Sequence, residues 1–323
     1  MFSTFVSRTS SNSCPSFILT ACLTAGCFCY FCIYLCTMVK LTTEVAIPAF
    51  GRKIGFDEEV MVLGSCFADS MGERLLRHGY KALVNPFGTL YNPLSIEEAI
   101  RRLDDGTLFS LEDCVEMGAG AGKICSFSHH TSFARESARE FLENANDKLT
   151  EARRFWEKAE TVIVNFDSAF IWSHNGKVVA NCLKRPAHEF ERRRITVEEC
   201  SITTAGLIAA HPEKHFIFSI SPIRHPGADG AHESTLSKAT LHLALDEVLR
   251  QTPAAVYFPS YEILMDELRD YRFYASDLLH PSETAMELIW DKFCVAALRP
   301  EDEQRRKENE KQWRRSQHIE KKR

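Results

Sequence analysis

The sequence predicts an α/β fold, and more specifically a three-layer α/β/α sandwich around a mainly parallel sheet. Four short apolar runs of four to six residues alternate with longer stretches in which apolar residues recur at helical spacing. Consecutive apolar residues are typical of strands buried on both faces, as the strands of a parallel sheet are. Strands that alternate with helices build βαβ units, which place helices on both faces of such a sheet.

The order of the expected elements follows from local signals. Gly64 ends the first apolar run. Two pairs, Ser95 with Glu98 and Thr196 with Glu199, have the spacing of capping boxes at helix N-termini. The expected strands are 60–63, 161–164, 215–220 and 254–258, and the expected helices are 68–76, 95–103, 138–159, 196–210, 236–249 and 282–293.

The composition is that of an ordinary globular protein, with 323 residues of which 45% are hydrophobic and 26% charged. The formal net charge of -5 argues against a dedicated nucleic-acid binder, which carries a strong basic surplus. No phosphate-cradling loop or dinucleotide fingerprint occurs, so we expect no organic cofactor. Of the twelve cysteines, six lie between Cys14 and Cys36, and the other six are scattered singly without the spacing of a zinc site. We therefore expect no metal and a body with reduced thiols.

The two ends of the chain differ from the body, which spans residues 40–297. Residues 1–39 form an apolar, Cys-rich segment, and its run 17–38 has about the 20 residues that a helix needs to cross a bilayer. This segment is either a membrane anchor or the product of a start assigned too early, since Met38 opens directly onto the body. The protein is tethered to a membrane in the first case and cytoplasmic in the second. Residues 298–323 form a charged tail, for which we expect a solvated, fraying helix.

The first candidate for a catalytic group follows the first expected strand. In an open parallel sheet, sites form beyond the carboxyl ends of the strands, and Gly64 allows a tight turn there. Ser65 and Cys66 then place a hydroxyl and a thiol at the N-terminus of the next helix. That position lowers the pKa of a thiol and offers backbone N–H groups to an oxyanion. Either side chain is therefore a candidate nucleophile.

An acid–base pair stands near the other end of the body. Asp277 and His280 are three residues apart on a loop before the helix that Ser282 caps. In acid–base–nucleophile sets, the His moves the proton, and the Asp orients the ring and stabilises the imidazolium. The two residues complete such a set if folding brings them to the strand end at Gly64.

Longer motifs carry a resemblance to a known family. Residues 64–68 read Gly-Ser-Cys-Phe-Ala, 85–93 read Asn-Pro-Phe-Gly-Thr-Leu-Tyr-Asn-Pro, 221–225 read Ser-Pro-Ile-Arg-His, and a long block runs from Tyr257 to His280. Together they resemble the GSCFA family over roughly residues 40–297. That family is grouped with the SGNH (GDSL-like) hydrolases, which are esterases and other acyl hydrolases on a flavodoxin-like fold. The resemblance implies this fold and a hydrolase, without fixing the substrate.

The resemblance also implies roles for single residues. In relatives with Gly-Asp-Ser after the first strand, the nucleophile is the second residue past the Gly, which here is Cys66; Ser65 takes this role if the turn is shifted by one residue. The oxyanion hole of such enzymes combines the N–H of the nucleophile with a Gly and an Asn from later loops, for which Gly88 and Asn181 are the candidates. The chain departs from the family at 165–168, which read Asn-Phe-Asp-Ser where the family favours a Gly-Thr pair.

Three further side chains are candidates for substrate contact. His129 and His130 are adjacent and point in different directions on any regular element, which suits a pocket wall better than a two-His metal site. Arg224 follows the third strand at the carboxyl edge, where a guanidinium either binds an anionic group or forms a salt bridge at the rim.

These observations predict an SGNH-like esterase or acyl hydrolase. It acts on an O-acyl ester of a small molecule or a glycan by nucleophile–His–Asp catalysis, with no nucleic-acid partner. One alternative is an O-acyltransferase that uses the same site. Another is a non-catalytic binding protein that keeps the fold, which the departure at 165–168 favours. A third alternative is a membrane-tethered scaffold, which only the N-terminal segment and the charged tail at 298–323 would support. The sequence does not indicate an oligomeric state.

Overall fold

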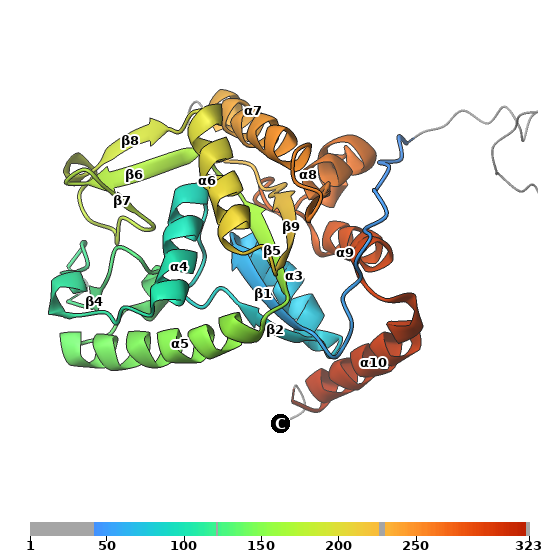
Figure 1. Ribbon diagram of the computed structural model, residues 1–323, viewed down its shortest axis with the longest axis horizontal. Helices are drawn as coiled ribbons and strands as arrows, with labels where there is room; N and C mark the ends of the chain where they lie inside the picture. The colour runs from blue at the N-terminus through green and yellow to red at the C-terminus, as the bar shows by residue number, and fades with distance from the viewer. Residues whose placement is uncertain (1–41, 121, 226–229, 321–323) are drawn as a thin grey trace, which may run out of the picture. The chain divides into compact units, whose positions relative to one another are not determined.

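A five-stranded parallel sheet forms the centre of the described part of the chain (Figure 1). The computed structural model describes residues 42–120, 122–225 and 230–320. The chain divides into two units, Met1–Thr43 and Glu44–Arg323, and all elements below belong to the second. The strands of the sheet are β1 (Glu59–Gly64), β2 (Lys81–Val84), β5 (Thr161–Phe166), β9 (His215–Ile220) and β10 (Ala255–Phe258).

The strand order is that of a flavodoxin-like sheet. The strands lie side by side in the order β2-β1-β5-β9-β10, and each neighbouring pair is parallel. Counted along the chain, this order is 2-1-3-4-5. The predicted fold class is confirmed. Strand β2 was not expected from the sequence, because Lys81–Val84 is a short run at the sheet edge and only partly buried.

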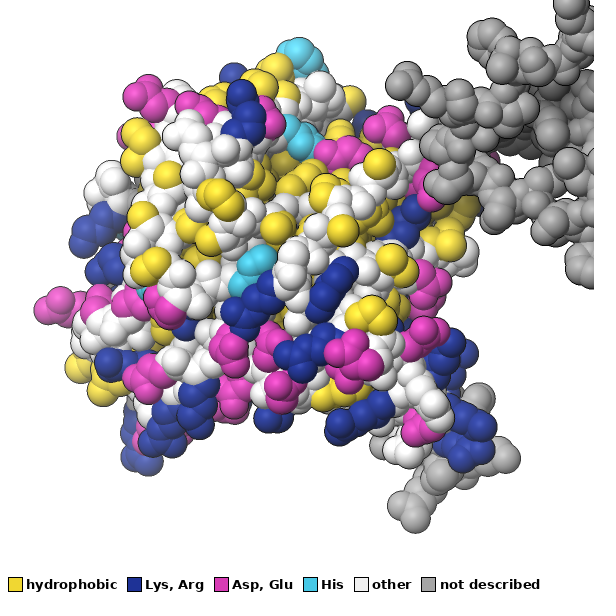
Figure 2. All heavy atoms as spheres, turned by 45° about the vertical axis from the view of Figure 1, so that its right-hand side comes forward, with side chains coloured by type: hydrophobic (Ala, Val, Ile, Leu, Met, Phe, Trp, Pro, Cys, Tyr) yellow, Lys and Arg dark blue, Asp and Glu magenta, His cyan; other side chains and the backbone are white. Residues whose placement is uncertain are grey.

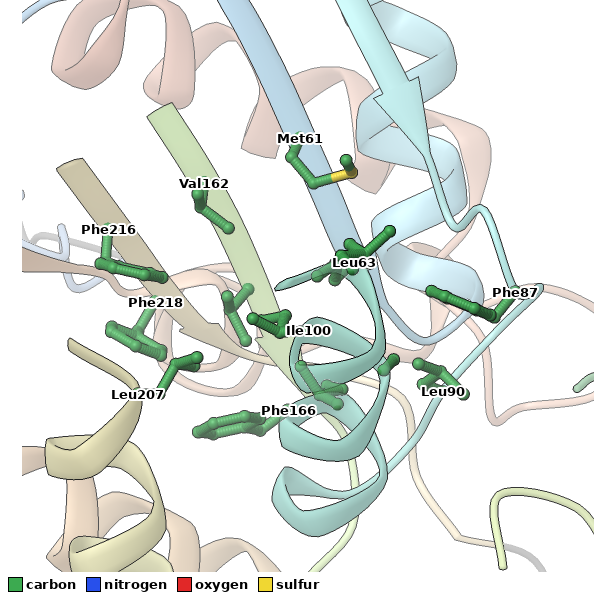
Figure 3. Close-up of a cluster of buried hydrophobic side chains, with 14 of the residues drawn as sticks. Met61, Leu63, Phe87, Leu90, Ile100, Val162, Phe166, Leu207, Phe216 and Phe218 are labelled. Atoms are coloured by element: carbon green, nitrogen blue, oxygen red, sulfur yellow. The ribbon is translucent and has the colours of Figure 1, made fainter. Parts of the chain in front are cut away.

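Helices cover both faces of the sheet. Alternate residues of β1 point to opposite faces, so Val60 and Val62 pack under α3 (Cys66–Arg77) and α9 (Glu283–Ala297). Met61 and Leu63 face α4 (Pro93–Asp105), α5 (Ala138–Lys158), α6 (Val197–Ala210) and α7 (Gly230–Leu249). Figure 3 shows this second core, where side chains of β1, β5 and β9 meet Ile100 of α4 and Leu207 of α6. A rigid sheet buried on both faces fixes the positions of the loops at its carboxyl edge.

The helix starts show where local signals were sufficient. Thr196 caps α6, and both bonds of the predicted capping box with Glu199 are present. The box predicted at Ser95 is wrong by three residues. Helix α4 begins at Pro93, and the Asn92 side chain accepts a hydrogen bond from the N–H of Ser95 over 2.9 Å. Pro suits the first helical position because its missing N–H has no partner there in any helix. Helix α7 begins six residues before the expected 236.

The connections carry elements that the sequence did not predict. The β5–α6 connection holds a three-stranded antiparallel sheet of order β7-β6-β8, with β6 (Phe170–His174), β7 (Lys177–Val179) and β8 (Glu191–Arg194) (Figure 1). A two-stranded ribbon, β3 (Val115–Glu116) and β4 (Ile124–Cys125), lies between α4 and α5. The short helices are η1 (Leu111–Asp113), η2 (Thr131–Phe133), η3 (Ala187–Glu189), α8 (Ser260–Glu262), η4 (Ile263–Leu268), η5 (Tyr271–Phe273) and η6 (Pro300–Asp302).

The C-terminal tail is helical and attached to the body. Helix α10 (Glu303–Glu320) is bound to the α3 end through Arg306, which is 8% exposed and donates to the Tyr80 hydroxyl and the Arg299 carbonyl. Asn309 donates to the carbonyl of His78 over 2.8 Å. The tail is therefore more than the solvated helix expected. On the face shown in Figure 2, positive and negative side chains alternate over the lower half.

The predicted membrane segment 17–38 lies outside the described residues. Within the part of the chain that the structure describes, no helix has the length and apolar character needed to span a bilayer.

Candidate active site

The end of β1 presents Cys66 at the start of α3. Gly64 has a φ of 149°, and a Cβ there would lie 2.4 Å from the carbonyl oxygen of Asn165 on the neighbouring strand. Any larger residue would therefore separate β1 from β5 at this point. Ser65 caps α3, and Cys66 is its first residue. Close packing of the two strand ends thus places the thiol at the carboxyl edge of the sheet.

The two candidate nucleophiles have different surroundings. The Ser65 side chain is fully buried, donates to Asn165 Oδ1 over 2.8 Å and accepts from the N–H of Phe67 over 3.3 Å. Both bonds hold β1, β5 and α3 together. Cys66 is only half-buried. Of the two, Cys66 is the one that a substrate can reach, while Ser65 has a structural role in this arrangement.

His280 and Asp277 lie next to the Cys66 thiol, although 214 residues separate Cys66 from His280. The distance from Cys66 Sγ to His280 Nε2 is 3.6 Å. The other ring nitrogen, Nδ1, lies 2.6 Å from Asp277 Oδ2. Folding therefore aligns thiol, imidazole and carboxylate in the order that nucleophile–His–Asp chemistry needs.

A hairpin-like loop, residues 273–282, holds the pair in place. Its two sides are joined by bonds from the N–H of Ala275 to the carbonyl of His280 and from the N–H of Ser282 to the carbonyl of Phe273, each 2.8 Å long. The N–H of Arg224 donates to the carbonyl of Leu279 over 3.2 Å, which ties the loop to the end of β9. The loop is thus anchored on both sides of the ring.

The Asp277 carboxylate is stabilised within its own loop. Oδ1 accepts from the N–H groups of His280 and Leu279, over 3.0 and 2.9 Å. These bonds, together with the His280 ring, lower the pKa of Asp277 to about 2. The group is therefore an anion at any working pH and orients the His280 ring.

The charges around the thiol correct one expectation from the sequence. Burial raises the pKa of Cys66 to about 11, and the carboxylates of Asp167 and Asp69 add to the rise. The N–H groups of Cys66 and Phe67 at the helix start oppose it, but by less. The predicted lowering of the pKa by the helix N-terminus is outweighed, and the Cys66 side chain rests as a neutral thiol.

Asp167, which the sequence analysis did not select, is the centre of a buried charge cluster. Lys238 is 2% exposed, and its ammonium donates to the Asp167 carbonyl over 2.6 Å and to Oδ1 over 3.2 Å. His225 Nε2 lies 3.6 Å from Oδ2. Burial favours the neutral acid, yet Lys238 and His225 together lower the pKa of Asp167 to about 2. The departure at 165–168 marked this position, but Lys238 carried no local signal.

The structure does not support the two residues proposed for the oxyanion hole. The N–H of Gly88 donates to the carbonyl of Asn85 over 2.7 Å, and a Cβ on Gly88 would lie 2.4 Å from the Cβ of His130. Gly88 thus serves a tight turn and a close contact. The Asn181 side chain accepts from the N–H of Leu183 over 2.8 Å, and the backbone N–H of Asn181 donates to the Phe127 carbonyl. Asn181 is therefore a turn residue in this arrangement.

The histidines proposed for substrate contact differ in burial. His129 is 1% exposed, bonds Ser126 through Nδ1 at 2.7 Å and packs against four phenylalanines. Burial lowers the pKa of His129 to about 3. It is a neutral core residue, and the prediction of substrate contact is wrong. His130 is half-buried, and it favours the charged form of the Asp69 carboxylate. Substrate contact by His130 stays a prediction.

Arg224 contributes its backbone and its side chain to the region of the hairpin loop. Its guanidinium lies beside Tyr274, whose pKa burial raises while Arg224 opposes the rise. An anion-binding role for Arg224 stays a prediction.

A cavity of about 910 Å³ adjoins the 85–92 loop. Phe87 of that loop lines it, together with the Ser126–Ser128 turn, α4 and the β6–β7 hairpin. Phe127 packs against His174 in its wall, with ring centroids 4.8 Å apart and ring planes tilted by 39°. Cys66 and His280 do not line this cavity.

The thiols and the acidic residues form no metal centre in the described ranges. Cys66, Cys114, Cys125, Cys182, Cys200 and Cys294 are free thiols. Among residues 42–120, 122–225 and 230–320, no three His, Cys, Asp or Glu side chains are grouped so that they could hold a metal ion.

Comparison with known proteins places the chain in a family. The model of the GSCFA family matches residues 59–293, and the chain belongs to this family. No curated protein matches it. Among solved structures, it is similar to an acetyl xylan esterase (Est2A) from the rumen bacterium Butyrivibrio proteoclasticus, with 10% identity and a TM-score of 0.31. That match covers 77% of this chain and 64% of the esterase chain.

Proposed function

We propose that the chain is an ester hydrolase in which Cys66 is the nucleophile, His280 the general base and acid, and Asp277 the residue that orients His280. The observation that carries the proposal is the continuous contact from Sγ through the imidazole to the carboxylate, at 3.6 and 2.6 Å. The motifs that resemble SGNH hydrolases supply these same three residues. The proposed substrate is an O-acyl ester.

The proposed reaction has two steps. In the first, Nε2 of His280 takes the thiol proton as Sγ attacks the ester carbonyl, and the alcohol leaves with that proton, so that a thioester remains on Cys66. In the second, His280 takes a proton from water, whose oxygen attacks the thioester, and the carboxylic acid and the free thiol are restored. Because the pKa of Cys66 is near 11, proton transfer accompanies the attack instead of preceding it.

The cavity beside Phe87 is the proposed site for the alcohol part of the substrate. Its volume of about 910 Å³ suits a ligand of several rings. Half-buried aromatic rings at Phe127 and His174 are surfaces on which a sugar ring stacks, and serine, carboxylate and guanidinium groups in the same wall bond hydroxyls. A carbohydrate ester is therefore the favoured substrate class within this proposal.

Two alternatives use the same residues. An O-acyltransferase would pass the acyl group from Cys66 to a second alcohol in place of water. A non-catalytic binding protein is favoured by Asp167, whose negative charge opposes both the thiolate and the developing oxyanion.

The test compares turnover of a short-chain aryl ester by the full chain and two variants. Cys66→Ala and His280→Ala should each lower kcat/KM by at least about 1000-fold, because the members of such a set act as a unit. Cys114→Ala, which removes another half-exposed thiol, is the matched control and should leave the rate unchanged. Unchanged turnover in both site variants would dismiss the proposed site. A wild-type chain that binds esters without turning them over would favour the binding protein.

A further inference from the structure

The proposed reaction creates a negative charge on the carbonyl oxygen, and several polar groups near the strand ends already donate hydrogen bonds within the protein. The N–H of Gly88 donates to Asn85. The amide of Asn85 donates to Asp69 Oδ1 over 2.6 Å. The amide of Asn165 donates to Ser219 Oγ over 2.9 Å. To bind the oxyanion at this edge of the sheet, the backbone N–H of Cys66 needs a second hydrogen-bond donor beside it.

The backbone of Tyr91 lies between the two strand ends that form the site. The N–H of Leu90 donates to the Gly64 carbonyl over 2.8 Å, which ties this segment to the end of β1. The N–H groups of Asp167 and Ser168 both donate to the Tyr91 carbonyl, each over 2.9 Å, which ties it to the end of β5. Leu90 is fully buried in the core of Figure 3, so the position of Tyr91 is fixed on both sides.

The Tyr91 hydroxyl is a protonated donor. The Thr89 hydroxyl donates to it over 3.3 Å, so the proton of Tyr91 itself is available for another acceptor. The ring is half-buried, and burial raises the pKa of the phenol. The charges at Cys66 and Asp167 add to the rise in the pKa of the phenol.

We propose that the Tyr91 hydroxyl donates a hydrogen bond to the carbonyl oxygen of the ester as Cys66 attacks it, and so forms the oxyanion hole together with the N–H of Cys66. This inference rests on the proposed function. It makes Tyr91 a catalytic residue that the spacing of the sequence motifs did not reveal. A neutral phenol suits the acidic surroundings of Asp167 and Asp69, since it donates a proton without adding another charge.

Tyr91→Phe in the full chain tests the inference, because it removes only the hydroxyl. We expect kcat for an aryl ester to fall about 100-fold with KM unchanged, as for the loss of one oxyanion-hole donor. A trifluoromethyl ketone, which adds to the thiol and leaves an oxyanion, should bind the variant about 100-fold more weakly. Alkylation of Cys66 by iodoacetamide creates no oxyanion and should keep its rate. Tyr271→Phe, on an exposed ring before the hairpin loop, is the matched control.

The outcomes distinguish failure of the Tyr91 role from failure of the proposed function. Wild-type kcat and wild-type affinity for the ketone in Tyr91→Phe would overturn the role of Tyr91 and leave the nucleophile untouched. An equal loss of turnover and of Cys66 alkylation would overturn it too, since that pattern indicates a structural role. Turnover that survives Cys66→Ala would remove the proposed function itself. A ketone that forms no adduct with wild-type Cys66 would overturn both.

Discussion

The electrostatics of the thiol can be tested by replacing one carboxylate. With a pKa of about 11, Cys66 should react with iodoacetamide along a pH profile whose midpoint lies near 11, in place of the ordinary 9.0. Asp167→Asn removes the carboxylate that raises the pKa of Cys66 more than Asp69 does. A like charge disfavours ionisation, so its removal must lower the pKa of Cys66 and raise the thiolate fraction at a fixed pH.

The magnitude follows from the thiolate fractions. At pH 8, a thiol with the ordinary pKa of 9.0 is about 10% ionised, and one with a pKa of about 11 is about 0.1% ionised. Wild-type Cys66 should therefore react about 100-fold more slowly than an ordinary thiol at this pH. Burial is the first cause of the shift and remains in the variant. Loss of one nearby charge should then increase the rate at pH 8 about tenfold.

The assay follows one peptide of the full chain. Trypsin releases Ile54–Arg74, in which Cys66 is the single cysteine, so mass spectrometry measures its alkylation alone. Asp246→Asn, which removes an exposed carboxylate paired with Arg250, is the matched control and should not change the rate. A wild-type midpoint at or below 9, or equal rates for Asp167→Asn and wild type, would refute this account of the site.

The same variant has a cost in stability that needs its own control. Removing one member of a buried ion pair leaves the other charge uncompensated, which typically costs about 3–5 kcal/mol. In Asp167→Asn the uncompensated group is the Lys238 ammonium, which is 2% exposed. The double variant Asp167→Asn/Lys238→Met removes both charges and should recover most of that loss. It should still react faster than wild type at pH 8, because the carboxylate is absent.

Two further predictions concern α4 and the cavity. The Ser95 hydroxyl is buried without a hydrogen-bond partner among the described residues, so Ser95→Ala should raise the free energy of unfolding by about 1 kcal/mol, read as a higher Tm; a lower Tm would contradict this. Ser128→Trp fills part of the cavity and should raise KM for an acetylated oligosaccharide about tenfold while leaving a short aryl ester unaffected. Ile202→Trp, at an exposed site on α6, is its control, and equal KM values for the two variants would exclude the cavity as the alcohol site.

Much of the fold was predictable because its signals are local. The apolar runs that became β1, β5, β9 and β10 are read from four to six adjacent residues, and each forms a strand of the sheet. The Thr196–Glu199 box was predicted correctly because both partners lie within one helical turn. The error at Ser95 was also local, since Asn92 followed by Pro93 is the stronger start signal three residues earlier.

The sequence motifs indicated part of the candidate site, but Gly88, Asn181 and His129 find no support in the structure, and the motifs did not indicate the electrostatics. Cys66, Asp277 and His280 were selected from motifs, and folding brings them together. The burial of His129 and the pairing of Asp167 with Lys238 depend on contacts between segments far apart in the chain. The spacing of residues along the chain cannot predict such contacts, because they form only when the helices pack on the sheet.

The charge state of the thiol connects the remaining features of the site. A cysteine that rests as a neutral thiol behaves like a serine hydroxyl, because a base must remove its proton during the attack. This requirement explains why the loop at 273–282 fixes the His280 ring with a carboxylate that is always ionised. The negative charge that develops on the carbonyl oxygen during the attack places a further demand on the oxyanion hole. A neutral donor such as Tyr91 meets that demand in a site where Asp167 and Asp69 already supply negative charge.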